Sequence, residues 1–224
     1  MQDIVISLGG SLIVPRDVDV DYLRSFRAFV MQHIYDYRFF IVCGGGSTAR
    51  KYIGAAEKIT AVKYEDRDWL GVHSTRLNAH LMRTIFAGVA YPRIIKNPTE
   101  KVDVKEQVAI GAGWKPGWST DYVTVLLAKT FGVGRVINLT DTDYVYDRDP
   151  KQNHDAKPLK QIDWKTFCGM VGEEWTPGLN VPFDPIASKE CKEHNMTVVI
   201  ANGRNMSNLE NIIAGKPYIG TTIQ

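Results

Sequence analysis

The sequence lacks any apolar run of the roughly 18 residues that a membrane-spanning helix needs. Nor does it open like a secretory signal peptide, because Asp3 interrupts the first apolar stretch and no charged segment precedes it. We therefore expect a cytoplasmic protein without a membrane partner.

Cysteine is scarce, with only Cys43, Cys168 and Cys191 among 224 residues. Their number is odd, they lie far apart and none belongs to a C-x-x-C pair. This pattern excludes a disulfide framework and favours reduced thiols. Cys43 ends an apolar run, and we interpret it as a buried spacer rather than a nucleophile.

Motifs of several common functional classes are also missing. No G-x-x-x-x-G-K-[ST] loop occurs, which argues against an ordinary P-loop NTPase, and no H-E-x-x-H motif or paired Cys/His set offers a zinc site. The net charge is only +2 and no block of Lys and Arg appears, so nucleic acid is not an expected partner.

The chain does have the composition and the alternation of elements that an α/β protein requires. Hydrophobic residues make up 44% and charged residues 23%, which suits one globular domain over 1–224. Short apolar runs alternate with amphipathic stretches, which predicts a doubly wound, mostly parallel sheet with helices on both faces. Strands are expected at 4–8, 39–43, 108–110, 133–139, 197–201 and 220–223, helices at 21–35, 49–58, 70–89, 121–131, 182–194 and 207–214, and a long loop or flap at 147–165.

Glycine-rich turns follow the first two expected strands. The first strand ends in Gly9-Gly10-Ser11, and the second ends in Gly44-Gly45-Gly46 with Arg50 in the first turn of the next helix. Backbone amides converge on an anion only where no Cβ blocks the approach, and a helix N-terminus adds favourable partial charge. We interpret the second turn as a phosphate site, whereas the first is equally compatible with a plain tight turn.

The loops after the next two strands are rich in polar and aromatic residues. The third loop, 111–121, ends in Ser-Thr-Asp at a helix start and carries Trp114 and Trp118, which either stack on a base or cover the end of the sheet. The fourth, 140–150, holds four aspartates, whose mutual repulsion calls for hydrogen-bond donors or a cation such as Mg²⁺.

Two alternatives of other classes remain open at this point. Gly44, Gly46 and Ala49 fit a G-x-G-x-x-A dinucleotide fingerprint with Asp66 about 20 residues on, as in nicotinamide-dependent oxidoreductases. No apolar strand leads into Asp66, however, as that fingerprint requires. A nucleotide or anion sensor without turnover is the other alternative.

Together these segments resemble the amino-acid-kinase family, and most closely its branch of archaeal UMP kinases. The resemblance runs along nearly the whole chain and rests on the loops named above and on 75–79 (Thr-Arg-Leu-Asn-Ala), 116–121 (Pro-Gly-Trp-Ser-Thr-Asp) and the terminal 220–223 (Gly-Thr-Thr-Ile). It implies a three-layer αβα sandwich of the carbamate-kinase type and transfer of a phosphoryl group from ATP to a phosphorylated acceptor. UMP is the acceptor that it favours, and another small acceptor is the alternative.

The resemblance also implies a division of labour. The acceptor side would span roughly 1–130 and the ATP side roughly 131–224, with Mg²⁺ carried mainly by the ATP phosphates and a hexamer built as a trimer of dimers. The residues implied to hold ATP are Gly10, Ser11, Gly46, Arg50, Thr140, Asp141, Tyr146 and Asp149. The residues implied to hold UMP are Gly45, Asp68, Trp114, Lys115, Pro116, Gly117, Trp118, Ser119 and Thr120.

Catalytic roles are implied for Asp121, Arg50 and Ser11, with Asp121 also a possible metal ligand. Two positions depart from the family pattern. Ser7 stands where many relatives carry a lysine, and Tyr144 where a glycine is usual. These departures motivate the sensor alternative and leave the transition-state cation open among Arg50, Lys51, Lys157 and Lys189.

Overall fold

The computed structural model describes residues 1–148, 150, 152–172 and 181–224. Its main sheet has seven strands in the order β3-β2-β1-β4-β8-β9-β7. The bounds are β1 (Gln2–Leu8), β2 (Tyr37–Cys43), β3 (Val108–Gly111), β4 (Arg135–Thr140), β7 (Gln161–Ile162), β8 (Thr197–Asn202) and β9 (Thr221–Ile223). All neighbours pair in parallel except β8 and β9, which confirms the expected mostly parallel sheet.

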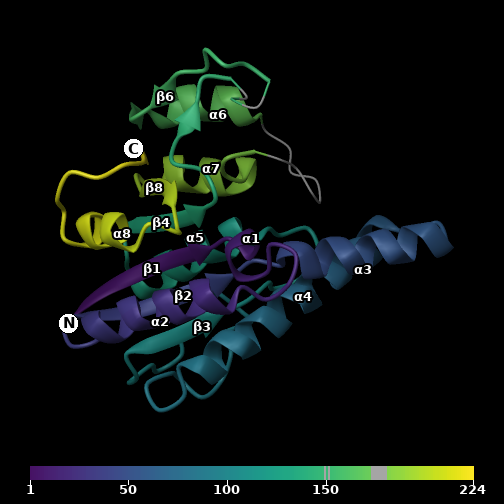
Figure 1. Cartoon of the computed structure of the whole chain (residues 1–224), viewed down its shortest axis with the longest axis horizontal. Coiled ribbons are helices and arrows are strands. Elements are labelled where there is room, and N and C mark those ends of the chain that lie inside the picture. The colour runs from purple at the N-terminus through teal and green to yellow at the C-terminus, as the bar shows by residue number, and fades with distance from the viewer. Residues whose placement is uncertain (149, 151, 173–180) are drawn as a thin grey trace.

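Helices cover both faces of this sheet, because successive side chains of its strands point to opposite sides (Figure 1). On β1, Ile4, Ile6 and Leu8 join one apolar cluster, whereas Val5 joins the other. The first cluster includes residues of α1 (Gly10–Ile13), α2 (Val20–His33), α4 (Tyr64–Ile85) and α8 (Met206–Ile213). The second includes residues of α5 (Thr120–Phe131), α6 (Trp164–Val171) and α7 (Pro185–Glu193). The predicted three-layer sandwich is therefore confirmed.

Helix α3 (Gly46–Ile59) is the exception among the long helices, since it extends away from the sheet (Figure 1). Only Ser47 of this helix is buried. By contrast with α3, helix α2 buries its three aromatic residues, Tyr22, Phe26 and Phe29. Their exposed fractions are 5%, 0% and 6%, so they belong to the core and not to an interface.

The four-residue helix α1 was not predicted, and two longer segments also differ from the sequence-based prediction. Helix α4 spans Tyr64–Ile85 rather than the expected 70–89, and the prediction missed its start because the first turn is charged and exposed and carries no apolar stripe. Glu65 and Asp66 there interact favourably with the helix dipole. The expected flap 147–165 contains β6 (Pro158–Leu159), which pairs with β5 (Val145–Tyr146), and it also contains β7 and the start of α6. Prediction of one long loop there was wrong.

The connectivity places one strand pair at the centre of the fold. From β1 the chain moves outward to β2 and β3, then returns to β4 on the other side of β1. In such sheets ligands bind at the carboxyl ends of the strands where the order reverses. The loops that follow β1, β2, β3, β4 and β8 all lie at that edge.

Candidate active site

The loops after β1 and β2 touch each other through their backbones. A Cβ atom added to Gly10 would lie 2.0 Å from the Gly46 nitrogen, and one added to Gly44 would lie 2.4 Å from the Gly10 nitrogen. Gly46 also has a φ of +62°, which side chains other than glycine rarely adopt. These three glycines are therefore required for the packing of the two loops, in addition to any approach of a ligand.

Backbone amides remain available where the two loops meet. Within the described part of the chain, the amides of Gly10, Ser11, Gly45 and Gly46 donate to no backbone carbonyl. Gly10 and Gly46 are the first residues of α1 and α3, so the N-termini of these two helices adjoin each other. Converging free amides at a helix start bind anions, so this region has the chemistry of a phosphate site.

Asp121, in the first turn of α5, lies beside this region and has unusual surroundings. The Ser7 hydroxyl donates to its Oδ1 at 3.0 Å, and the backbone amide of Asp184 donates to its Oδ2 at 3.3 Å. Burial, and then the neighbouring charge of Asp184, raise the pKa of Asp121 to about 7. Ser7, one of the two departures from the family pattern, is thus a hydrogen-bond donor to this carboxyl group.

Asp184 is a site residue that the sequence did not reveal. It caps α7, its Oδ1 accepting from the Ala187 amide at 2.6 Å, and a capping role accounts fully for such a residue before a proline. Its Oδ2 is buried without a hydrogen-bond partner among the described residues, and burial raises its pKa. Only the tertiary fold brings it against Asp121, 63 positions earlier.

The two carboxylates fit a partial ligand set for Mg²⁺. That ion commonly takes one or two carboxylates and completes its shell with phosphate oxygens and water. The unpartnered Oδ2 of Asp184 is an oxygen donor of the required kind. No group of three or more His, Cys, Asp or Glu side chains gathers in the described ranges, so they offer no complete protein cage for a metal.

Aromatic rings order the loop after β3. Trp118 stacks on Tyr122 of α5 with centroids 4.5 Å apart, and Trp114 stacks on Trp118 at 6.2 Å. The Lys115 ammonium lies 4.2 Å from the centre of the Trp114 ring. Trp114 and Trp118 are half-buried, and this stacking is compatible with both roles left open for them, contact with a base and cover for the end of the sheet.

The remaining predicted acceptor residues lie on the same loop or face it. Asp68 of α4 is 7% exposed, and its Oδ2 accepts from the Gly117 amide at 2.6 Å. Burial raises the pKa of Asp68. Ser119 caps α5 by accepting from the Tyr122 amide, and Thr120 is the first residue of that helix. Pro116 adjoins Gly117, so the predicted set is brought together.

Hydrogen-bond donors from elsewhere in the chain contact two of the aspartates in the acidic loop after β4. Asn202 donates to Asp143 at 3.0 Å, and the Lys157 amide donates to Asp147 at 2.8 Å, which lowers the pKa of Asp147. Within the described residues, donors from outside the loop thus reach two of its four aspartates. Thr140 is the last residue of β4, Asp141 lies on the loop and Tyr146 lies on its short strand β5, whereas Asp149 lies outside the described residues.

The C-terminal strand holds this loop in place through Thr221. The Thr221 hydroxyl accepts from the Val145 amide at 2.9 Å and donates to the Leu159 carbonyl, and the residue is fully buried. A single hydroxyl thus joins β9 to both β5 and β6.

Because the resemblance implies that this loop belongs to the ATP side, we expect Thr221→Val to raise the KM for ATP several-fold and leave the KM for the acceptor unchanged. The substitution keeps the shape of the side chain but leaves two buried backbone groups unsatisfied, at a cost of about 1–3 kcal/mol each. Steady-state kinetics and thermal unfolding of Thr221→Val and Thr221→Ser measure this, and the serine variant should behave like the parent. Equal changes in both KM values would contradict the assignment.

The candidate cations after β2 and the candidate acid of the dinucleotide fingerprint have different surroundings. Arg50, the fifth residue of α3, is exposed, and the Lys51 ammonium donates to the Arg16 carbonyl and to Asp17 at the surface. Asp66 is exposed in the first turn of α4 and does not follow a strand. The dinucleotide fingerprint therefore lacks its ribose-binding acid, which disfavours the oxidoreductase alternative.

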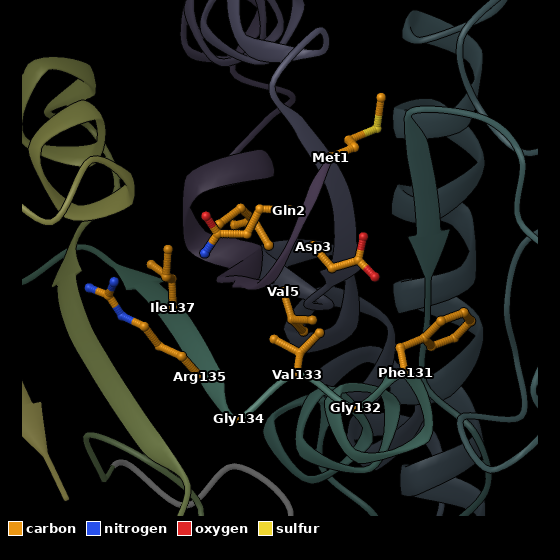
Figure 2. Close-up of a pocket in the computed structure, with 11 residues that line it drawn as sticks. Met1, Gln2, Asp3, Val5, Phe131, Gly132, Val133, Gly134, Arg135 and Ile137 are labelled. Atoms are coloured by element: carbon orange, nitrogen blue, oxygen red, sulfur yellow. The ribbon is translucent and has the colours of Figure 1, made fainter.

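A cavity of about 460 Å³ lies at the opposite edge of the sheet (Figure 2). The amino ends of β1 and β4 and the end of α5 line it, with Asp3, Arg135 and Phe131 among the lining residues. Arg38 already neutralises Asp3 through a bidentate ion pair. This cavity is separate from the loops described above.

Comparison with known proteins now identifies the class. The family model described as the amino acid kinase family matches residues 3–202. The chain belongs to the amino acid kinase family.

Within that family the chain is similar over its whole length to archaeal proteins named uridylate kinase. The one from Thermococcus kodakarensis is 32% identical over 225 residues, covering 99% of both chains. The one from Thermoplasma volcanium is 33% identical over 226 residues, covering 100% of this chain and 98% of that protein. The crystal structure of uridylate kinase from Archaeoglobus fulgidus superposes with a TM-score of 0.85 at 27% identity and covers all of both chains.

Proposed function

We propose that this protein is a nucleoside monophosphate kinase that transfers the γ-phosphoryl group of ATP to UMP and forms UDP and ADP. The observation that carries the proposal is the group of free amides at Gly10, Ser11, Gly45 and Gly46 beside Asp121. The names of its full-length relatives support UMP as the acceptor.

The two substrates would approach this centre from two sides. We assign the acceptor to the part formed by 1–130, whose loops follow β1, β2 and β3. ATP is assigned to 131–224, whose loops follow β4 and β8. The two halves meet between β1 and β4, where Ser7 and Asp184 contact the same aspartate.

Phosphoryl transfer requires mainly alignment and stabilisation of charge on the equatorial oxygens. A phosphate oxygen of UMP attacks the γ-phosphorus, the bond to the bridging oxygen breaks, and ADP leaves with the electron pair. The acceptor phosphate is already deprotonated near pH 7, so no general base is needed. Amides of Gly10 and Ser11 would bind the transferring group, with Arg50 supplying positive charge nearby.

Mg²⁺, when bound, supplies charge neutralisation on the β- and γ-phosphate oxygens. Asp121 and Asp184 are the residues that would hold it. Burial raises the pKa of both carboxyl groups, and a metal ion bound there would favour the charged form of each.

Further properties implied by the family likeness are part of this proposal. They are a hexamer assembled from dimers, a cytoplasmic location, and a place in pyrimidine nucleotide biosynthesis. In the described ranges no helix combines the length and apolar character needed to cross a membrane.

A coupled ADP-release assay with a panel of acceptors tests the proposal. We expect UMP to turn over at least ten times more efficiently than carbamate, acetylglutamate or isopentenyl phosphate. A different winner would refute the acceptor while leaving kinase activity intact. Tight ATP binding without ADP release from any acceptor would instead identify a non-catalytic sensor.

A further inference from the structure

One turn of helix α4, Thr75–Asn78, contacts two of the loops at the carboxyl edge of the sheet. The sequence singled out this Thr-Arg-Leu-Asn segment as a family mark without assigning it a role. In the structure Asn78 reaches the loop after β2, and Thr75 and Arg76 reach the loop after β3.

Asn78 holds the loop after β2, residues 44–46, which is the glycine loop of this turn's contacts. Its side-chain amide donates to the Gly44 carbonyl at 2.8 Å and to the Gly45 carbonyl at 3.1 Å, and the residue is 3% exposed. Both carbonyls belong to the loop whose amides point to the phosphate site. A buried two-carbonyl contact of this kind orients the peptide units and therefore the amides that follow them.

Thr75 and Arg76 hold the start of the loop after β3, residues 112–119, which is the acceptor loop of the proposed function. The Gly113 amide donates to the Thr75 hydroxyl at 2.8 Å, and Arg76 donates to the Trp114 carbonyl at 2.7 Å and more weakly to the Gly113 carbonyl at 3.3 Å. A Cβ on Gly113 would lie 2.8 Å from the Thr75 hydroxyl oxygen, so this loop is pressed against the helix.

Arg76 is also a cation without a carboxylate partner in the described part of the chain. Its guanidinium lies over the Trp69 ring at 5.9 Å and its hydrogen bonds go to neutral carbonyls. Burial alone lowers its pKa. An uncompensated charge beside the acceptor loop favours an anionic ligand there.

We propose that the Thr75–Asn78 turn is a positioning element that sets the spacing between the phosphate-binding glycine loop and the acceptor loop. Thr75 and Asn78 lie three residues apart, about 4.5 Å along a rigid helix, so the two loops cannot move apart without breaking these hydrogen bonds. The turn thereby selects acceptors whose phosphate and base are joined by a ribose. This inference rests on the proposed function and adds the residues that determine its specificity.

Arg76→Met and Arg76→Lys test the acceptor side of this element. We expect Arg76→Met to raise the KM for UMP at least tenfold while the KM for ATP stays within twofold. The advantage of UMP over ribose 5-phosphate in kcat/KM should also fall at least tenfold. Lysine retains one donor and should recover part of the loss. Arg83→Met, seven residues further along α4, is the matched control and should match the parent.

Asn78→Leu tests the glycine-loop side, and we expect it to raise the KM for both substrates because the glycine loop is shared. If this buried variant fails to fold, the Arg76 pair still decides.

Equal rises of both KM values in Arg76→Met would show a merely structural role and overturn the inference. If the parent chain is active on UMP and Arg76→Met leaves its KM for UMP unchanged, this inference is overturned while the proposed function stands. A parent chain inactive on UMP would refute the proposed function and the ribose spacing with it.

Discussion

A chain carrying Asp121→Asn is expected to lose about 100- to 1000-fold in kcat, the usual cost of removing one preorganised charged or polar group at a reaction centre. The same variant is expected to be at least as stable as the parent. Asp121 and Asp184 are neighbouring carboxyl groups with little access to water, and ionisation of both is unfavourable. An asparagine can still accept from the Asp184 amide and contact the Ser7 hydroxyl.

The gain in stability should depend on pH in a defined direction. The pKa of Asp121 is about 7 in the folded chain, against an ordinary value of 3.8, so the folded state binds the proton more tightly than the unfolded state. The contribution of Asp121 to stability therefore falls as pH rises from about 4 to 7 and stays low above that. Asparagine lacks this loss, so the stabilisation should be larger at pH 8 than at pH 5.

Thermal unfolding with EDTA across this pH range, together with kcat at saturating substrates, measures both effects. Asp36→Asn is the control, because Asp36 is exposed and lies between α2 and β2, away from the site. A variant that retains activity would remove Asp121 from the reaction centre. A variant destabilised at pH 8 would show that the paired carboxylates are favourable and not strained.

Gly10→Ala should abolish most activity through geometry alone. The added Cβ would lie 2.0 Å from the Gly46 nitrogen and 2.7 Å from the Gly44 carbonyl carbon, and backbone atoms cannot move aside as a flexible side chain can. The two glycine loops must therefore separate by an ångström or more. Displacement of about 1 Å in aligned reactants costs about 100-fold, so we expect at least that loss in kcat/KM.

Gly54→Ala provides the control for this experiment. Gly54 lies inside α3, and no atom lies within 4 Å of the position that an added Cβ would take. Alanine should therefore stabilise the helix by up to about 1 kcal/mol and leave kinetics unchanged. Kinetic assays and circular dichroism of both variants distinguish loop displacement from unfolding. Normal activity in Gly10→Ala would mean that the contact between the two loops is not required.

Local patterns in the sequence accounted for most elements of the fold. Strands β1, β2, β3, β4 and β8 are short apolar runs that end in glycine or polar residues, so both the strand and its end were predictable. Helix α6 was overlooked although its buried Trp164, Phe167 and Val171 follow helical spacing. The signals failed for β7, because a two-residue strand with one buried side chain leaves no period to detect. Prediction of α4 missed its exposed first turn because that turn carries no apolar stripe.

For the candidate site, the sequence by itself determined where glycine, serine, arginine and aspartate cluster directly after strands, and so predicted which loops carry the chemistry. Only the tertiary structure decided which side chains meet. Asp184 joins Asp121, and Thr221 joins the loop after β4, across 63 and 76 positions. Asn78 and Arg76 likewise bind loops 34 and 38 residues away. Periodicity and capping act over a few residues, whereas these hydrogen bonds depend on the order of the strands in the sheet. That is why the sequence reveals the glycine loops but not the helical turn that holds them.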